Sequence, residues 1–368
     1  MADIASMNGV AAASIAEING VAKAAIAKLG GVDMPASGAT LWCLVAADGG
    51  LATAAHSDLN DWTGYVNSGL SGRSKDFNEI AYGKDGSGNP LWVAVAEYDS
   101  ARQHEIWYSS DPTNTSGWTA GTDPGAGMGG IAWGNNVWVA VGGSGMIYRS
   151  TDGASWTDIT SDLDGDVSEW TNSVGLQDVA SDGAGNWICT QADRVYYSSD
   201  NGVTWELGED WNDGYTAYSC GYTNSKWVVF RGKTGHTRIV TSSNGTTWAT
   251  AVQTGDASKG IGNEARNFAA GAGTIIIVAG DDISRSTDTG ANFTKTTNTL
   301  NRSGSRHIAT DGNGTWVVVY DSGRVDINTN NGAPGSWVEQ TGGQLTFPSS
   351  GANVENLDAV AADVYLPV

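Results

Sequence analysis

Several residue types are scarce in this chain of 368 residues. It has three cysteines, seven prolines and five phenylalanines, and only 19 lysines and arginines against 40 aspartates and glutamates. An odd number of cysteines gives no disulfide framework, and no zinc-type spacing joins them. We therefore expect Cys43, Cys189 and Cys220 to be small buried residues in strands of different sheets.

The shortage of positive charge excludes several classes of partner. At a net charge of −21 the chain has no basic surplus with which to displace counterions from nucleic acid or to dock on anionic lipid. No run of eighteen apolar residues predicts a transmembrane helix. The N-terminus lacks the basic start and uninterrupted apolar core of a secretory signal. We expect neither nucleic acid nor membrane as a partner.

Glycine and tryptophan, at 51 and 16 residues, are abundant instead, and they recur in a pattern. A polar turn rich in Ser, Asp, Asn and Gly runs into an aromatic residue seven times. The clearest copies span residues 150–156 and 199–205, and the gaps between the aromatic positions are 38 to 56 residues. A period in this range indicates an array of four-stranded units. The aromatic positions are Trp62, Trp118, Trp156, Trp205, Trp248, Phe293 and Trp337.

Each unit has three further strand signals separated by Gly/Asn/Asp/Ser turns. The second and third strands are short apolar runs, such as Val137–Val141 and Met146–Ser150. The first, inner strand carries a two-residue signature. Its copies are Ile80-Ala81, Ile131-Ala132, Val179-Ala180, Tyr218-Ser219, Phe268-Ala269, Ile308-Ala309 and Val360-Ala361.

The two ends of this region complement each other. Leu41–Ala47, Leu51–His56 and Asp61–Tyr65 resemble second, third and fourth strands without a first strand, and Leu357–Leu366 resembles a first strand alone. Together they complete one unit and remove the last exposed sheet edges. The sequence therefore predicts an all-β, seven-bladed β-propeller over residues 41–368, closed by strands from both termini. A linear β-solenoid is the structural rival, but it needs capping units rather than complementary halves.

The turn motif Ser-x-Asp-x-Gly-x-x-Trp resembles the Asp-box of sialidase-like propellers. In that turn Asp or Asn accepts hydrogen bonds from backbone N–H groups, and Gly supplies a positive φ. The aromatic ring then packs between neighbouring sheets. The resemblance implies that the turns lie on the face opposite any ligand site, so we interpret them as fold chemistry rather than catalytic residues.

Residues 1–40 carry a different, shorter repeat. Asn8-Gly9-Val10-Ala11 recurs as Asn19-Gly20-Val21-Ala22 and, more weakly, as Gly30-Gly31-Val32, at a spacing of eleven residues. The alanine content favours helix, whereas Asn-Gly at this spacing favours tight turns between short strands, and both remain open. A segment this small cannot bury a core of its own. It is either an unanchored tail or an arm that orders against a partner, a second copy of itself or the propeller flank. The expected docking residues are Ile15, Ile18, Val21, Ile26 and Leu29.

Tandem Asn-Gly-Val-Ala repeats at an N-terminus resemble those of tailed-bacteriophage structural proteins. The resemblance implies a virion protein whose arm, residues 1–40, binds other virion proteins and whose propeller faces outward as a homo-oligomer on the particle. We expect decoration, fibre or receptor contact, with a host-surface glycan as a candidate ligand and no enzymatic activity. The alternatives are an Asp-box glycoside hydrolase and a glycan-binding lectin.

Few residues in the sequence suggest a catalytic or ligand-binding site. Sialidase-like enzymes need an arginine triad, and the nearest approach to an Arg-Ile-Pro element, Arg238-Ile239-Val240, lacks the proline. Arg266 and Arg306 lie at equivalent positions, two residues before the inner-strand signature, where they could hold an anion at the channel mouth. Glu79 and Asp178 directly precede two inner strands, and a hydrolase could use such a carboxylate pair.

Two loops offer binding residues. Asp162, Asp164 and Asp166 alternate in one loop, as calcium ligands do, although the EF-hand pattern is not met. We expect no cofactor, with calcium as the one candidate metal against a solvated acidic loop.

Aromatic residues in two loops suit stacking on a sugar ring, a protein contact or packing between loops. They are Trp170 in that loop, and Trp211 and Tyr215 in the next blade's loop. The one basic cluster falls on an expected second-to-third loop, where it would complement an acidic partner or form a solvated hairpin tip. It comprises Arg231, Lys233, His236 and Arg238.

Overall fold

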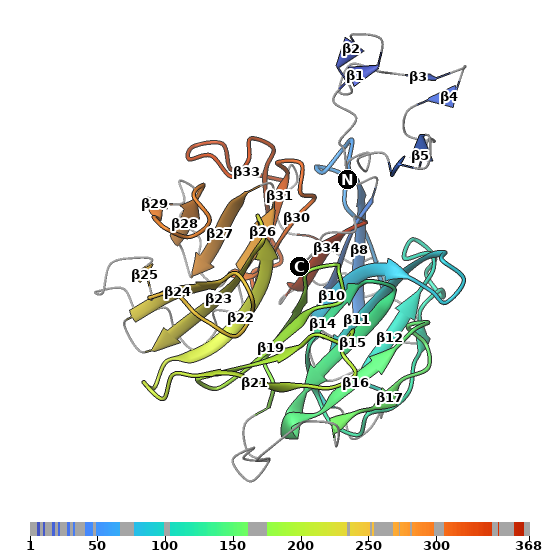
Figure 1. The fold of residues 1–368 in the computed structure, drawn as a ribbon. Helices are drawn as coiled ribbons and strands as arrows, with labels where there is room; N and C mark the ends of the chain where they lie inside the picture. Colours follow the sequence, from blue (N-terminus) through green and yellow to red (C-terminus); the bar gives the residue numbers. More distant parts are fainter. Residues whose placement is uncertain are drawn as a thin grey trace.

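The seven inner strands of this protein follow one another in a closed circuit, each in contact with the next (Figure 1). Each inner strand begins a four-stranded antiparallel sheet, so the molecule is a seven-bladed β-propeller, as predicted. The computed structural model describes residues 6–7, 10–11, 17–18, 21–22, 28–29, 32–33, 41–46, 49–66, 77–98, 104–160, 175–233, 236–250, 252–253, 268–271, 273–279, 282–297, 305–340, 345 and 357–363.

Blades 1 to 6 follow the chain, each running from inner to outer strand. Blade 1 contains β10 (Phe77–Lys84), β11 (Pro90–Ala96), β12 (Ile106–Ser109) and β13 (Thr119–Ala120). Blade 2 contains β14 (Met128–Gly134), β15 (Val137–Gly142), β16 (Ile147–Ser150) and β17 (Thr157–Asp158), with a short 3-10 helix at Gly143–Gly145. Blade 3 contains β18 (Asp178–Ser181), β19 (Trp187–Gln191), β20 (Arg194–Ser198) and β21 (Glu206–Asp210).

Blades 4 to 6 repeat this order. Blade 4 contains β22 (Thr216–Thr223), β23 (Lys226–Lys233), β24 (His236–Ser242) and β25 (Val252–Gln253). Blade 5 contains β26 (Phe268–Gly271), β27 (Thr274–Ala279), β28 (Asp282–Ser286) and β29 (Thr294–Thr297). Blade 6 contains β30 (Ser305–Thr310), β31 (Trp316–Tyr320), β32 (Val325–Asn328) and β33 (Val338–Glu339).

Blade 7 is built from both ends of the propeller. β34 (Leu357–Ala362) forms its inner strand, and β7 (Leu41–Ala46), β8 (Gly50–Ala55) and β9 (Thr63–Val66) complete it. Val360 pairs with Leu44 in the antiparallel ladder, and the backbone N–H of Asp363 donates to the Leu41 carbonyl at 3.0 Å. The predicted complementary half-blades are therefore confirmed.

Within residues 1–40 the described residues form three antiparallel pairs of two-residue strands. They are β1 (Ser6–Met7) with β2 (Val10–Ala11), β3 (Glu17–Ile18) with β4 (Val21–Ala22), and β5 (Lys28–Leu29) with β6 (Val32–Asp33). Of the two structures that the repeat left open, the described residues adopt short strands rather than helix.

The hydrophobic core lies between blades rather than within one sheet. Second strands such as β15 and β31 are buried along their whole length because a neighbouring blade covers each face. One cluster joins Leu91 and Val93 of blade 1 to Ile131, Trp138 and Trp156 of blade 2. The aromatic residue after the polar turn thus packs between sheets, as predicted.

The polar turn of blade 2 shows why its residue types recur. The Ser150 hydroxyl accepts hydrogen bonds from the Asp152 and Gly153 backbone N–H groups and donates to Asp152 Oδ1. Asp152 Oδ1 also accepts from the Ala154 and Ser155 N–H groups at 2.9 and 2.8 Å. Gly153 has a φ of 72°, a conformation that favours glycine.

Two sequence assignments need correction in blade 4. The ladder places Cys220 opposite Val229 and Tyr222 opposite Trp227, as Ile80 stands opposite Ala94 and Tyr82 opposite Trp92 in blade 1. The inner-strand signature of blade 4 is therefore Cys220-Gly221, and Tyr218-Ser219 lies two residues before it. The basic cluster lies in β23 and β24 rather than in a loop, because this hairpin extends beyond the predicted strands.

All three cysteines are free and buried in strands of different blades, as predicted. Burial raises the pKa values of the Cys189 and Cys220 thiols well above their usual value. Among the described residues, no helix has the length and apolar character needed to cross a membrane.

Candidate functional site

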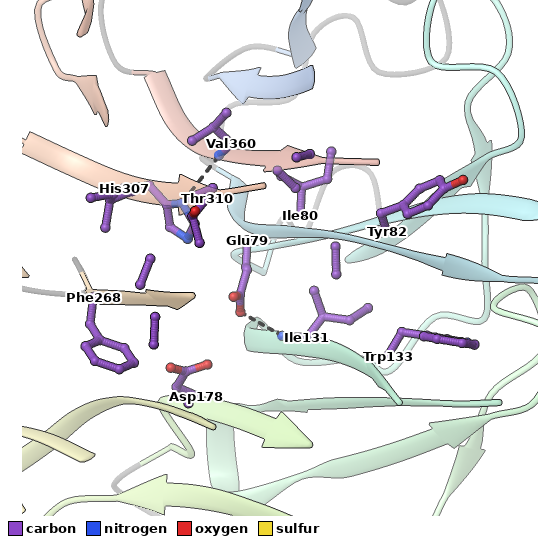
Figure 2. A pocket seen from close by; sticks show the side chains of 18 of the residues that line it. Glu79, Ile80, Tyr82, Ile131, Trp133, Asp178, Phe268, His307, Thr310 and Val360 are labelled. Carbon is purple, nitrogen blue, oxygen red and sulfur yellow. Dashed lines mark hydrogen bonds between the residues drawn. The ribbon is translucent and has the colours of Figure 1, made fainter. Parts of the chain in front are cut away.

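The central channel is a cavity of about 110 Å³ lined by residues of the inner strands. Each inner strand is the edge of its blade, so its outward backbone groups face this channel. Figure 2 shows Glu79, Asp178 and His307 toward one end of the cavity and the rings of Tyr82 and Trp133 toward the other. The carboxylates lie near the starts of the inner strands, on the face where second and third strands are also joined.

Glu79 and Asp178 both accept hydrogen bonds from the inner strand of the next blade. Glu79 Oε2 accepts from the Ile131 backbone N–H at 2.8 Å, drawn as a dashed line in Figure 2. Asp178 Oδ2 accepts from the Cys220 N–H at 2.8 Å. Ile131 and Cys220 occupy the same position of the repeat, so these two carboxylates serve the same structural purpose in blades 1 and 3.

His307 extends this row of contacts. The Val360 backbone N–H donates to His307 Nδ1 at 3.4 Å, and Val360 is again the equivalent residue of the next blade. The repeat position two residues before the signature adds a second row of contacts between blades. Asp358 Oδ2 accepts from the Phe77 N–H at 3.2 Å. Asn78 Nδ2 donates to the Met128 carbonyl at 2.7 Å. These inter-blade contacts satisfy backbone groups that an edge strand leaves unpaired.

The two carboxylates also approach each other around Gly130. A Cβ placed on Gly130 would stand 2.8 Å from the Asp178 Cα, 3.1 Å from Asp178 Oδ1 and 3.2 Å from Glu79 Oε2, and the close backbone approach favours glycine here. Paired carboxylates can act as acid and base or nucleophile in glycoside hydrolysis. Here Glu79 and Asp178 each also accept a backbone hydrogen bond.

The loop before β22 in blade 4 brings together two of the predicted binding residues. Trp211 is partly buried and Tyr215 is 7 % exposed. The Arg231 guanidinium lies 3.9 Å from the Trp211 ring centroid, and the Arg238 guanidinium lies 3.9 Å from the Tyr215 centroid. Loop packing therefore occupies both rings, and sugar stacking on them stays a prediction.

Asp213 of the same loop is the anionic partner in this cluster. Arg231 donates to both of its carboxylate oxygens, and Arg238 Nη1 lies 3.5 Å from Oδ2. Burial raises the pKa of Asp213, but the hydrogen bonds and charges of the arginines outweigh that effect and hold it below the usual value. Arg231 is only 1 % exposed, so it is not part of a solvated hairpin tip.

The described part of the chain places none of the other predicted site residues in this cluster. Trp170, Asp162, Asp164, Asp166, Arg266, Ile15 and Ile26 lie outside them. Ile18, Val21 and Leu29 belong to β3, β4 and β5, and Arg306 belongs to β30, where the ladder has a register shift. The paired-arginine and calcium hypotheses stay predictions.

A shallower hollow of about 350 Å³ lies at the same face between blades 1, 2 and 3. Glycines line much of it, and Gly127 is required because a Cβ there would stand 2.8 Å from the Tyr98 backbone nitrogen. Tyr98 is 44 % exposed at its rim, one of few large hydrophobic side chains exposed among the described residues.

Sequence reasoning missed the inter-blade contacts of His307, Asn78 and Asp358, of which His307 also lines the channel. Their position in the repeat could have identified them, because each lies one or two residues before an inner-strand signature. No group of three or more His, Cys, Asp or Glu side chains in the described part of the chain is arranged to hold a metal ion.

Comparison with solved structures identifies the fold. YCF48 bound to a D1 peptide is similar to this chain with a TM-score of 0.54 at 14% identity, over 77% of this chain and 91% of that one. A GH74 xyloglucanase from Xanthomonas campestris gives a TM-score of 0.59 at 15% identity, over 82% of this chain and 52% of that one. The chain thus spans about half the length of the xyloglucanase.

The computationally designed Ika8 protein gives a TM-score of 0.51 at 10% identity, over 84% of this chain and 91% of that one. No protein-family model matches the sequence, and no curated protein matches it either. At such low identity the similarities show the propeller fold alone. The fold hosts both hydrolases and non-enzymes, so function has to be argued from residues.

Proposed function

We propose that this chain is a non-enzymatic structural protein of a tailed-phage virion. Its arm, residues 1–40, docks on other virion proteins, and its propeller faces outward as part of a homo-oligomer. The observation that carries the proposal is the arm itself. Three antiparallel strand pairs recur every eleven residues with the same register, outside the closed ring. Two-stranded pairs this short need a partner to be stable.

Two further features support the proposal. The sequence Asn-Gly-Val-Ala between and within these pairs resembles that of tailed-phage structural proteins. Glu79 and Asp178, the best candidate catalytic carboxylates, link neighbouring blades instead of standing unengaged in the channel. The hydrogen bonds around Ser150 and Asp152, and a similar set around Ser198 and Asp200, support membership of the Asp-box class of propellers.

Deleting residues 1–38 tests the docking role. The shortened propeller should melt at the temperature of the full chain yet no longer incorporate into particles assembled in its presence. A full-length variant with Gly9, Gly20 and Gly31 each replaced by Val keeps the arm's length but disfavours two-residue turns. It should also fail to incorporate. Normal incorporation of the deleted protein would disprove docking through the arm.

A glycan-active propeller is the second candidate, because two observations favour it. Glu79 and Asp178 flank Gly130 closely, and Tyr98 is exposed beside the hollow between blades 1 and 3. Turnover of a polysaccharide panel that is lost in both Glu79→Gln and Asp178→Asn would establish a hydrolase. Binding on a glycan array without turnover, lost in Tyr98→Ala, would establish a lectin.

A further inference from the structure

The β23–β24 hairpin of blade 4 is longer than its counterparts. Its ladder runs through seven residue pairs, from Trp227 with Ser242 to Lys233 with His236. The corresponding ladders of the other six blades have four to six pairs. The added pairs lie beyond the Trp227, Val229 and Val240 core of the blade and carry the chain's one basic cluster.

The basic residues of this extension share one face of the hairpin. Arg231 stands opposite Arg238 and Lys233 opposite His236 in the ladder. Residues two apart on a strand, and residues directly opposite on its partner, point to the same side of a sheet. Like charges in opposed positions destabilise a hairpin, so this arrangement needs compensation from outside the two strands.

The loop before β22 supplies that compensation. Trp211 covers the Arg231 guanidinium at 3.9 Å, Asp213 pairs with it, and the Tyr215 carbonyl accepts from its Nη2 at 3.2 Å. The Tyr215 ring in turn lies 3.9 Å from Arg238 and 5.5 Å from Lys233 Nζ. Arg231 and Arg238 are therefore held in position before any partner arrives, and Lys233 lies beside the Tyr215 ring. We call Trp211, Asp213, Tyr215, Arg231, Lys233 and Arg238 the blade 4 platform.

Charge on the platform is not balanced. Asp213 is shared between Arg231 and Arg238, and Asp193 is the other carboxylate whose charge acts on Arg231. Asp210 is already paired with Arg194 at 3.0 Å. Among the described residues, three cations thus face two carboxylates, and the exposed end of the platform carries Lys233 and the 28 % exposed Arg238. A local positive site stands on a chain whose net charge is −21.

The spacing of these cations points to the shape of the partner. Lys233 and Arg238 lie diagonally across the ladder, because Arg238 stands opposite Arg231, and diagonal neighbours are roughly 7–8 Å apart. Alternate side chains of an extended peptide are separated by a similar distance, roughly 6.6 Å. A peptide with carboxylates at alternate positions can therefore pair with Lys233 and with Arg238 at once. The platform's rigidity reduces the side-chain entropy lost on binding.

We propose that the blade 4 platform binds an extended acidic peptide segment of a partner protein. The interaction goes beyond the virion role proposed above and does not depend on the arm. Carboxylates at alternate positions contact Lys233 and Arg238, while Arg231 and Asp213 stay paired beneath them. Because the contact is electrostatic and partly exposed, it weakens as salt rises.

The test measures binding of the full-length protein to fluorescent peptides by anisotropy. The probes are Glu-Thr-Glu-Thr-Glu, its Gln-Thr-Gln-Thr-Gln counterpart and oligogalacturonate. The acidic peptide should bind, and the double variant Lys233→Gln/Arg238→Gln should weaken it about tenfold, as expected for lost charge pairs. The control Lys226→Gln removes an exposed cation at the other end of β23 and should leave binding unchanged. Arg231 is left intact because its burial makes it part of the fold.

Four results would overturn the proposal. The first is equal binding of the glutamine peptide, and the second is equal weakening by Lys226→Gln. The third is tighter binding of oligogalacturonate than of the acidic peptide, which would assign the platform to acidic glycans instead. Absence of binding by the acidic peptide at millimolar concentration and low salt also contradicts it. Unchanged melting temperatures of the variants show that the fold is intact.

Discussion

At the scale of single residues, the protein depends on side chains that accept hydrogen bonds from backbone N–H groups without a backbone acceptor. In the polar turn of blade 2, Asp152 receives three hydrogen bonds, two of them from backbone N–H groups. Without it, those N–H groups would point into a tight turn with no protein acceptor. The residue types of the turn are therefore set by backbone geometry, which explains why they recur in blades with different surfaces.

Replacing Asp152 by Ala should destabilise the propeller by about 1 kcal/mol, the usual contribution of a partly exposed hydrogen-bonding carboxylate. The variant keeps Gly153 and Trp156, so only the acceptor is lost. Urea denaturation followed by tryptophan fluorescence measures the change. Thr157→Ala, an exposed change in β17, serves as the control and should alter stability little. Equal stability of Asp152→Ala and the wild type would show that the turn does not need the carboxylate.

The turn carboxylates also predict a pH dependence. Burial raises the pKa values of Asp152 and Asp200, but hydrogen bonds from neighbouring backbone and hydroxyl groups outweigh it and leave both below the ordinary value of 3.8. Hydrogen bonds from Asn292 lower the pKa of Asp288. Their stabilising contribution is complete above the unfolded pKa and is lost as the pH falls through the folded pKa.

Stability should therefore decrease below about pH 3.8 as these groups take up protons. The double variant Asp152→Asn/Asp200→Asn keeps an acceptor oxygen at each turn but cannot titrate. Its urea midpoint should decrease less than that of the wild type between about pH 5 and about pH 3. Parallel losses in both proteins would contradict the assignment.

At the scale of elements, the inner strands meet a problem common to sheet edges, because one side of each lacks a ladder partner. In blades 1, 3 and 6, a side chain just before the signature reaches the next blade's N–H group. Five inner strands also have a register shift near their start, and bulges are known to redirect side chains. The same residues thus provide acceptors for the N–H groups of edge strands and hold neighbouring blades together.

The carboxylates of the channel should accordingly behave as structural residues. Glu79→Ala and Asp178→Ala each leave a backbone N–H without its acceptor and should cost about 1–3 kcal/mol of unfolding free energy. Glu79→Gln and Asp178→Asn retain an acceptor oxygen and should cost less. Chemical denaturation measures all four variants. If the Ala variants are as stable as the wild type, the inter-blade hydrogen bonds are not important to the fold.

The loop of Asp162, Asp164 and Asp166 gives a second prediction at this scale. If the alternating carboxylates bind calcium, the melting temperature should rise in millimolar calcium, because a ligand that binds only the folded state stabilises it. Asp164→Asn should reduce the rise, and magnesium should give a smaller one. No shift in calcium would remove the site and leave a solvated acidic loop.

At the scale of the whole molecule, stability rests on a closed ring. β34 pairs with β7 near the start of the propeller, and its Leu357, Ala359 and Val360 are fully buried. A separate core cluster fills each of the seven interfaces between neighbouring blades, so opening the ring at one place exposes apolar surface on two blades. Closure is therefore a property that no single blade possesses.

Truncation after Asn356 should remove this closure and abolish cooperative unfolding, or lower stability by several kcal/mol, since the five buried residues of β34 and one ladder are lost. Truncation after Asp363 keeps β34 and its bond to Leu41 and should leave the fold intact. Thermal and urea unfolding of both variants provide the measurement. A fully stable protein ending at Asn356 would show that closure is not required.

Much of the fold was predictable because propeller blades depend on local signals. Turn residues, β-branched runs and the spacing of Trp positions each reflect backbone conformation or packing that a short segment determines. The register of the strand pairing was harder to predict from the sequence. In blade 4 the signature was placed two residues early, at Tyr218-Ser219, because the true pair, Cys220-Gly221, differs in residue type from the apolar-Ala pair of the other blades.

The candidate sites were less predictable for a related reason. Glu79 and Asp178 were identifiable as channel carboxylates, but their acceptor roles depend on the backbone of a neighbouring blade some fifty and forty residues away in sequence. Arg231 looked like part of an exposed loop, and its burial follows from a longer hairpin and a loop from the preceding connection. Such contacts are set by the arrangement of blades.

The sequence by itself determined the seven-fold repeat, the closing half-blades and the separation of residues 1–40 from the ring, because each depends on patterns within a few dozen residues. Only the tertiary structure decided which side chains attach one blade to the next and which cations stand together on blade 4. Those outcomes depend on the distances between sheets once the ring is closed. Only in the closed ring do the edge N–H groups meet their acceptors, the opposed arginines meet Asp213, and Glu79 and Asp178 meet at Gly130.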